Sequence, residues 1–476
     1  MPKYSPFQIR HRRAARASLY SSFALAGLIV FLLGLLIGER LLIIDDSSRS
    51  LAEWEAVREV RLLRDYVRID TRERELEGAQ WLYAQLSELG LDPVLEEVGD
   101  GRANVWAVLE GETPEALVLH NHIDVFRVLS PEAWDHPPFA GVIEPPFLHG
   151  RGVFDMKSLA IAQLEAIRAL AESDSKPYRS VIFLATADEE SGSRLGTSWV
   201  LREHPELAAR FELVLTEGGV VEPLSTTEVK YWGIETAQRR YAEGWACAPE
   251  RGVLEDLYRS LKDQVDGDGM PRVTPDVERF MASYAPSRQD GHLTWVLEQI
   301  VSGQTDPIDF GRLPRYLRSF FLDEIFPFPI EEVEGGGFRM RLVGLLLPGG
   351  DLEALRAEKL PDWMAHGVTI AFGPAIGIDG GSPTDSDRFR VLVDSLSSAH
   401  PQATIGAYFL HSSATDSRFF RRLGIPSYGF SPFLLFNTES FRADDLNERI
   451  NLPGFVEGVE LYVGVVNELA NHEQSV

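Results

Sequence analysis

Hydrophobic and polar positions follow two different patterns along the chain after residue 50. Apolar residues recur at helical spacing within charged stretches, and we expect helices over 50–66 and 73–89. Short continuous apolar runs predict strands over 104–109, 116–120, 181–187 and 212–216. The segment 156–172 lies between two of these runs and is expected to be helical. Because strands and helices alternate, the pattern predicts an α/β fold with a mostly parallel sheet.

The middle of the chain has a different character. A helix is expected near 253–264, and the stretch 265–290 that follows is irregular and contains Pro, Gly and Asp. After residue 380 the chain returns to helix, strand and loop. This order predicts a main domain in two parts, which are interrupted by an inserted α+β domain. The predicted ranges are 50–228 and 381–476 for the main domain and 229–380 for the insertion.

The N-terminal segment has the features of a membrane anchor. Residues 17–38 form 22 consecutive positions without charge or proline, and a helix of that length crosses a hydrocarbon core of about 30 Å. A cleaved signal peptide is the alternative, but it requires a shorter apolar stretch and a small-x-small cleavage site, which the sequence does not supply. We therefore predict a basic cytoplasmic tail over 1–16 and a transmembrane signal anchor over 17–44. Everything after Asp45 is then extracytoplasmic, with the periplasmic side of a bacterial inner membrane as the preferred location.

Composition and charge narrow the function. The 476 residues include 46 Lys and Arg against 72 Asp and Glu, a formal charge of −26, which argues against a nucleic-acid partner. The first 44 residues hold 6 basic and 1 acidic residues, which leaves 40 against 71, a net of −31, in the remainder. Cys247 is the single cysteine, so neither an intramolecular disulfide nor a cysteine-based zinc cluster can form.

Acidic and histidine side chains gather where the predicted strands end. One group follows each of three strands and one precedes a helix: His122 with Asp124, Asp155, Asp188-Glu189-Glu190, and Glu217. Ligands of open α/β sheets bind outside the carboxyl ends of the strands, so these segments can converge on one site. A neutral imidazole with several carboxylates suits zinc, manganese or cobalt. Taken singly, each group also fits a solvated loop, and Asp155 also fits a helix cap.

The order and spacing of these motifs resemble the aminoacylase and carboxypeptidase S family of co-catalytic metallopeptidases, whose sites hold two zinc ions bridged by an aspartate. The resemblance covers about residues 55 to 470. Its most specific stretches are His122-Ile-Asp-Val, Trp134-Asp-His-Pro-Pro-Phe139, Gly150-Arg-Gly-Val-Phe-Asp155-Met-Lys157, Asp188-Glu-Glu190, Thr216-Glu-Gly-Gly219, Thr415-Asp-Ser-Arg418 and Asn447-Glu-Arg-Ile450. It implies a zinc-exopeptidase-like catalytic domain, with the insertion serving as a lid or dimerisation domain.

The resemblance also implies a role for each matching residue. His122, Glu190 and Glu217 would bind metal, and Asp155 would bridge two zinc ions. Asp124 would orient His122, and Glu189 would be the general base. Arg418 would meet a substrate carboxylate, although a structural salt bridge is an equal interpretation.

The sequence departs from the family at two positions. Asp444 stands where the family has its last metal-binding histidine, so the second metal is held by Asp444 or Asp445, bound weakly, or absent. We favour retention, with the preference shifted from zinc toward manganese. The second departure is at 245–250, where the family's lid histidine is missing. Candidates to replace it are His292, His411, Arg239 and Arg240.

Together these observations predict a metal-dependent hydrolase of amide bonds next to a free carboxylate, in a short peptide or an N-acyl amino acid. Two zinc ions are expected per site, with manganese or cobalt as alternatives, and a homodimer is implied by the family's lid domain. The competing hypothesis is a catalytically idle, membrane-tethered homologue that binds peptides or a partner protein.

Overall fold

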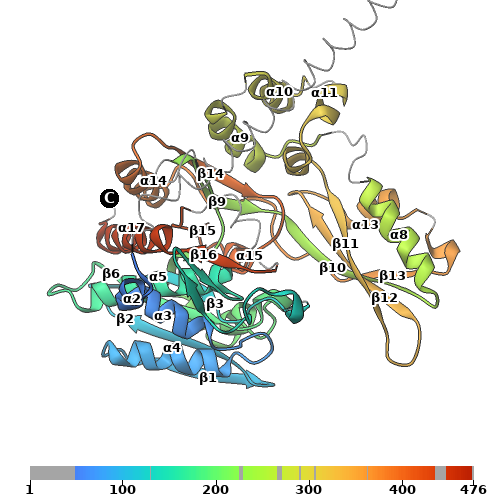
Figure 1. Ribbon diagram of the computed structural model, residues 1–476. Coiled ribbons are helices and arrows are strands. Elements are labelled where there is room, and N and C mark those ends of the chain that lie inside the picture. Colours follow the sequence, from blue (N-terminus) through green and yellow to red (C-terminus); the bar gives the residue numbers. More distant parts are fainter. Residues whose placement is uncertain are drawn as a thin grey trace, which may run out of the picture.

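A computed structural model describes residues 49–473 of the protein, apart from 129, 224–228, 265–270, 289–290, 305–306, 362 and 435–445 (Figure 1). The predicted tail and anchor, 1–44, and the predicted ligand Asp444 lie outside the described residues. Within the described part of the chain, no helix combines the length and apolar character needed to span a membrane.

The main domain is built on a nine-stranded sheet. The strand order is β1 (Val94–Gly99), β2 (Arg102–Leu109), β6 (Arg179–Thr186), β3 (Thr113–His122), β7 (Phe211–Thr216), β15 (Ser427–Gly429), β9 (Val229–Gln238) and β14 (Thr404–Leu410), and β8 (Val220–Pro223) also pairs with β9. The four strands β6, β3, β7 and β15 run parallel, as does the pair β9 and β14. The four strands predicted from apolar runs are all present.

The prediction of a mostly parallel sheet is wrong, because the sheet is mixed both at its edges and between β15 and β9. Strands β1 and β2 are antiparallel because only Asp100 and Gly101 separate them, too short a connection for a parallel crossover. Strand β2 is also antiparallel to β6, and β15 is antiparallel to β9.

Helices cover both faces of this sheet. On one face lie α3 (Arg58–Val67), α4 (Leu76–Glu88), α5 (Ser158–Ala171), α14 (Asp387–Ala399) and α17 (Leu452–Asn471), and on the other α6 (Thr197–Glu203), α7 (Pro205–Ala208) and α15 (Ser417–Arg422). The sequence of β6 is continuously apolar because helices cover both of its faces. Val181 and Phe183 belong to the core under the first group of helices, and Ile182 and Leu184 belong to the core under the second. The predicted helix 50–66 is two helices, α2 (Leu51–Ala56) and α3, because the backbone at Val57 is extended.

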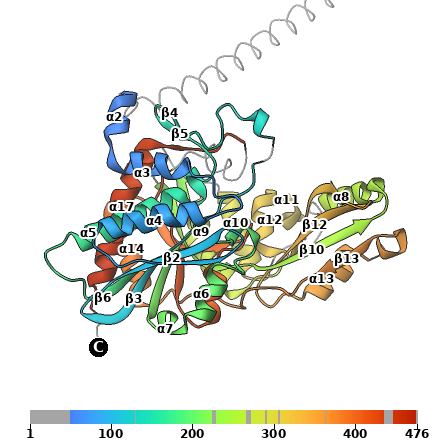
Figure 2. The same cartoon turned by 90° about the horizontal axis from the view of Figure 1, so that it is seen from below.

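A second, four-stranded sheet, called the lid below, lies beside the main domain (Figures 1 and 2). Its order is β11 (Glu324–Glu332), β12 (Phe338–Leu346), β10 (Arg240–Ala248) and β13 (Thr369–Phe372), and α8 (Arg251–Gln264) and α13 (Leu352–Lys359) pack on it. The structure places β9, where the predicted insertion begins, in the large sheet. The helices α9 (Pro275–Ser287) and α10 (Gly291–Val301) share a core with β9 and β14, so they too pack on the main domain.

A small three-stranded sheet lies at the end of the main domain. Its order is β16 (Arg449–Asn451), β5 (Phe147–His149) and β4 (Val142–Glu144). Pairing of β16 with β5 brings the C-terminal part of the chain beside the loop 150–155. That loop carries one of the predicted metal ligands.

Candidate active site

His122 lies at the centre of the candidate site. It is the last residue of β3, and its ring is almost fully buried. The Nε2 atom lies 3.1 Å from Asp155 Oδ1 and 3.8 Å from Glu217 Oε2, and Nδ1 lies 2.9 Å from the main-chain oxygen of Asp124. Burial opposes protonation of the ring, but hydrogen bonds to Asp124, Asp155 and Glu217 raise the pKa of His122 well above its usual value.

Asp155 is presented by a loop that Glu448 holds in place. The Oε1 atom of Glu448 accepts the backbone N–H groups of Phe154 at 2.8 Å and Asp155 at 3.3 Å. Its Oε2 atom accepts Gly152 N–H at 2.9 Å and Arg151 Nη1 at 2.7 Å. Gly152 has φ +75°, and a Cβ there would lie 2.2 Å from Val125 Cγ1, so this turn requires glycine. The sequence motif Asn447-Glu-Arg-Ile450 signalled Glu448 but not this role.

Asp124 positions the two adjacent glutamates. They follow β6 after Asp188, whose backbone is left-handed at φ 67°. The Oδ1 atom of Asp124 accepts the N–H of Glu189 and Oδ2 accepts that of Glu190, each at 3.0 Å. The same Oδ1 lies 3.5 Å from His122 Nδ1, farther than the main-chain oxygen. The carboxylate predicted to orient His122 therefore holds the Glu189–Glu190 backbone, and its own carbonyl contacts the imidazole.

The carboxylates of the site repel one another. Burial and the charge of Glu217 raise the pKa of Glu189 well above its usual value, and Arg418 partly offsets this. Burial and the charge of Asp155 likewise raise the pKa of Glu217. Crowded, buried carboxylates are costly unless a cation compensates them.

This donor set fits divalent metal ions. Two overlapping groups of three residues have ligand atoms within 4.8 Å of one another: His122, Asp155 and Glu190, and His122, Glu189 and Glu217. One imidazole with several carboxylates suits zinc or manganese. The structure thus brings together all the described members of the predicted metal site.

The cluster opens into a cavity of about 270 Å³ between the main domain and the lid. Its lining includes Glu189, Glu190, Glu217 and Arg418 from the main domain, and Tyr241, Glu243, Phe328 and Arg341 from the lid. Arg341 Nη2 donates to Tyr241 Oη at 2.6 Å, and Arg341 Nε lies 2.9 Å from Glu243 Oε1. Sequence reasoning missed these lid residues, because no local motif marks them.

Arg418 lies beside Glu189 in the wall of the cavity. It is in the first turn of α15, where its guanidinium is 3.5 Å from Glu189 Oε1 and 3.5 Å from Asp416 Oδ1. Both contacts are longer than a close ion pair. Arg418 therefore has acidic neighbours and also faces the space where a substrate would bind.

The four candidates to replace the lid histidine lie elsewhere. His411 contacts the Phe320 ring at 3.8 Å, and Arg239 is buried against Glu324 at 2.8 Å. Arg240 donates to the Gly350 carbonyl at 3.1 Å, and His292 stacks with Trp295 on α10. None of the four is among the described residues that line the cavity.

Comparison with known proteins gives consistent matches. The model of Peptidase family M20/M25/M40 matches residues 118–468. Mouse aminoacylase-1 is 26% identical over 429 residues, which cover 87% of this chain and 95% of the mouse protein. The probable carboxypeptidase S-like 2 of Dictyostelium discoideum is 36% identical over 396 residues, which cover 76% of this chain and 73% of the relative.

Two solved structures share the fold. Human carnosine dipeptidase 1 superimposes with a TM-score of 0.68 at 14% identity, covering 87% of this chain and 97% of that chain. An M20 family metallo-carboxypeptidase from Sulfolobus solfataricus superimposes with a TM-score of 0.65 at 16% identity, covering 87% of this chain and 99% of that chain. At these identities the likeness establishes the fold.

Proposed function

The chain belongs to peptidase family M20/M25/M40, and from this premise we propose that it is a metal-dependent hydrolase of amide bonds next to a free carboxylate. The proposed substrates are short peptides and N-acyl amino acids, in keeping with the aminoacylase and carboxypeptidase names of its relatives. The observation that carries the proposal is the convergence of His122, Asp155, Glu189, Glu190 and Glu217 on one cavity.

Each residue of the cluster has a role in this reaction. His122, Asp155, Glu190 and Glu217 would hold the metal, and the family resemblance implies that two ions would share Asp155. A bound dication polarises the scissile carbonyl and lowers the pKa of water. Glu189 takes the proton of the attacking water and passes it to the leaving amine. Burial and the neighbouring Glu217 raise the pKa of Glu189 above its usual value, which favours its role as a proton acceptor and donor.

The free carboxylate of the substrate requires a cationic partner. Arg418 and Arg341 both line the cavity, from opposite domains. Arg418 already neighbours the acidic groups Glu189 and Asp416, whereas Arg341 is tied to Tyr241 and Glu243 on the lid. We assign carboxylate binding to Arg418, as the motif predicts, with Arg341 as a second contact.

In this proposal the metal preference depends on Asp444, which stands where the family has its last metal-binding histidine. Two zinc ions are proposed, with selectivity shifted toward manganese if Asp444 or Asp445 supplies an oxygen ligand. The Asp444→His variant tests this assignment: we expect tighter zinc binding by the full chain in a competition titration. Unchanged zinc affinity would remove Asp444 from the ligand set.

The deciding experiment compares the full chain with its Glu189→Gln variant. Hydrolysis of dipeptides and N-acyl amino acids is measured in zinc, manganese and cobalt, together with bound metal. We expect the variant to lose about 10²–10⁴-fold in turnover with its metal content retained. The exposed Glu206→Gln serves as the matched control. Absence of both bound metal and turnover in the parent would instead support the idle peptide-binding homologue.

Location and assembly are also proposed. The uncharged segment 17–38 anchors the protein in a membrane with the hydrolase domain outside the cytoplasm, and two chains associate through the lid. Fractionation of cells that express the full chain or a chain lacking 1–44 tests the anchor. Recovery of both proteins in the soluble fraction would refute it. Analytical ultracentrifugation in detergent tests the dimer, which a single monomeric species would exclude.

A further inference from the structure

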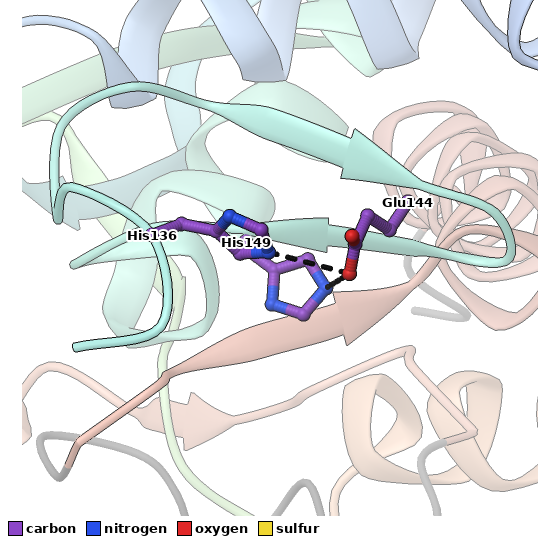
Figure 3. A group of neighbouring side chains, drawn as sticks. All are labelled: His136, Glu144 and His149. Carbon is purple, nitrogen blue, oxygen red and sulfur yellow. Dashed lines mark ion pairs between the residues drawn. The ribbon is translucent and has the colours of Figure 1, made fainter.

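A second group of metal-ligating side chains lies on the three-stranded sheet (Figure 3). Glu144 is the last residue of β4, His149 is the last residue of β5, and His136 lies in the loop before them, after η1 (Pro131–Ala133). His136 Nε2 is 3.3 Å from Glu144 Oε2, and His149 Nε2 is 3.9 Å from the same oxygen. The ligand atoms of all three lie within 4.8 Å of one another.

These separations match a shared metal ion. Zinc bonds of about 2.0–2.2 Å in a tetrahedral arrangement place neighbouring ligand atoms roughly 3.3 Å apart. The His136–Glu144 distance already has that value, the His149–Glu144 distance is 0.6 Å longer, and the two histidine nitrogens lie within 4.8 Å of each other. Small movements of the side chains would therefore complete the set. The two imidazole rings meet edge to face, with centroids 4.9 Å apart and planes at 67°, and both point a nitrogen at the carboxylate in Figure 3.

The backbone and the burial of the group favour a preformed site. Strand β5 pairs with β4 and β16, which fixes His149 opposite Val142 and Arg449. The side chains of His149 and His136 are only 12% and 25% exposed, whereas Glu144 is 64% exposed. Two imidazoles are therefore held in position, and the flexible carboxylate at the surface is free to adjust to an ion.

The alternative to a metal site is a hydrogen-bonded group, in which the Nε2–H of each imidazole donates to Glu144. Zinc binding requires the same two nitrogens to be unprotonated acceptors, so measurement of bound zinc distinguishes the two arrangements. The pair of nitrogen ligands selects zinc over calcium and magnesium, which prefer oxygen.

We infer that His136, Glu144 and His149 form a peripheral zinc site, separate from the proposed catalytic cluster. The site joins the loop at His136 to the β4–β5 hairpin, and the chain leaves that hairpin directly into the Gly150–Asp155 loop. Its role is to fix the entry to that loop. The inference is independent of the proposed hydrolytic activity, because it concerns only metal binding.

Zinc stoichiometry of the full chain tests the site. The parent, a His136→Ala/His149→Ala double variant and a Glu144→Gln variant are equilibrated with zinc, and bound metal is counted by mass spectrometry. We expect the double variant to lose one zinc per chain, and Glu144→Gln to bind that zinc at least 10-fold more weakly in a chelator competition. Circular dichroism shows whether each protein is folded. If the double variant is unfolded, the zinc affinity of Glu144→Gln tests the site.

His204 provides the matched control. It also contacts two carboxylates, Glu96 at 3.2 Å and Glu206 at 3.3 Å, but through opposite ring nitrogens, so one ion cannot take all three. His204→Ala should therefore retain the full zinc content. An equal zinc content in the parent and both site variants would overturn the inference. So would anomalous scattering from zinc-soaked crystals with peaks at the catalytic cluster and none between His136 and His149.

Discussion

Asp124 and Glu189 are joined by a hydrogen bond from the backbone N–H of Glu189 to Asp124 Oδ1, at 3.0 Å. The other oxygen of the same carboxylate accepts the N–H of Glu190 at the same distance. The proposed base and a proposed metal ligand are therefore held by one side chain at the end of a neighbouring strand. Asp124 is a positioning residue, because it acts through the glutamates and through His122.

The Asp124→Asn variant tests this positioning. An amide has one acceptor oxygen and one NH2 group, so one of the two backbone N–H groups loses its acceptor and faces a donor instead. We expect about a 10–100-fold loss in metal affinity or in kcat/KM, as for other residues that support metal ligands. Both quantities are measured, together with those of the exposed Asp174→Asn control. Parental values for both would contradict the assigned role.

The Glu448–Arg151 pair should be important for stability. Both side chains are almost fully buried, and Glu448 also accepts three backbone N–H groups of the Asp155 loop. In Glu448→Gln, Arg151 loses the opposite charge at 2.7 Å, and removal of one partner from a buried pair costs about 3–5 kcal/mol of unfolding free energy. Urea unfolding measures this change.

The control for that measurement is Glu172→Gln, which removes the exposed partner of Arg168. We expect a change of less than about 1 kcal/mol there, because solvent screens exposed pairs. Equal effects of the two substitutions would show that the Glu448 pair is no more important than a surface contact.

The elements around the metal cluster were predictable because their signals are local. Strands β3, β6 and β7 are buried on both faces and stand out as apolar runs, and each ends in an acidic or histidine motif. Since parallel strands end at the same edge, the convergence of His122, Glu189 and Glu217 followed from sequence alone. The mixture of parallel and antiparallel strands could not be predicted from the sequence, because the pairing partner of a strand depends on contacts between distant parts of the chain.

Strand β9 illustrates what the local pattern concealed. It crosses the core of the large sheet but carries Glu235, which is fully buried and paired with both terminal nitrogens of Arg421 at 2.7 and 2.8 Å. A charged residue inside a strand weakens the apolar signal, so the segment resembled the start of a different domain. The lid residues Tyr241 and Arg341 were missed for a related reason: they become cavity walls only when two domains meet.

Arg341 should affect substrate binding more than catalysis. Arg341→Met removes a cationic wall of the cavity while its aliphatic volume is kept. A hydrogen bond between charged groups contributes about 1.5–3 kcal/mol, so we expect KM for a substrate with a free carboxylate to rise roughly 10–100-fold. The same substrate with an amidated C-terminus should show no such difference between parent and variant.

Arg339 is the control for this measurement. It lies two residues away on β12 but pairs with Glu331 and is not one of the described cavity-lining residues. Arg339→Met should leave KM within about twofold of the parent. A similar rise in KM for both variants would attribute the effect to the lid sheet and not to carboxylate binding.

His411 should make the protein sensitive to acid. Burial, and then the nearby charge of Arg239, lower the pKa of His411 to about 3, and the ring packs on Phe320. The unfolded chain binds a proton here near pH 6.5, so between about pH 6.5 and 3 it holds more protons than the folded chain. Stability therefore falls as the pH decreases through this range, by at most a few kcal/mol from this residue.

In His411→Gln, which cannot be protonated, the fall in urea midpoint from pH 7 to pH 4.5 should be smaller than in the parent. The partly exposed His472→Gln, just after α17, is the control, and a pH dependence of His411→Gln equal to that of the parent would show that other groups cause the acid sensitivity.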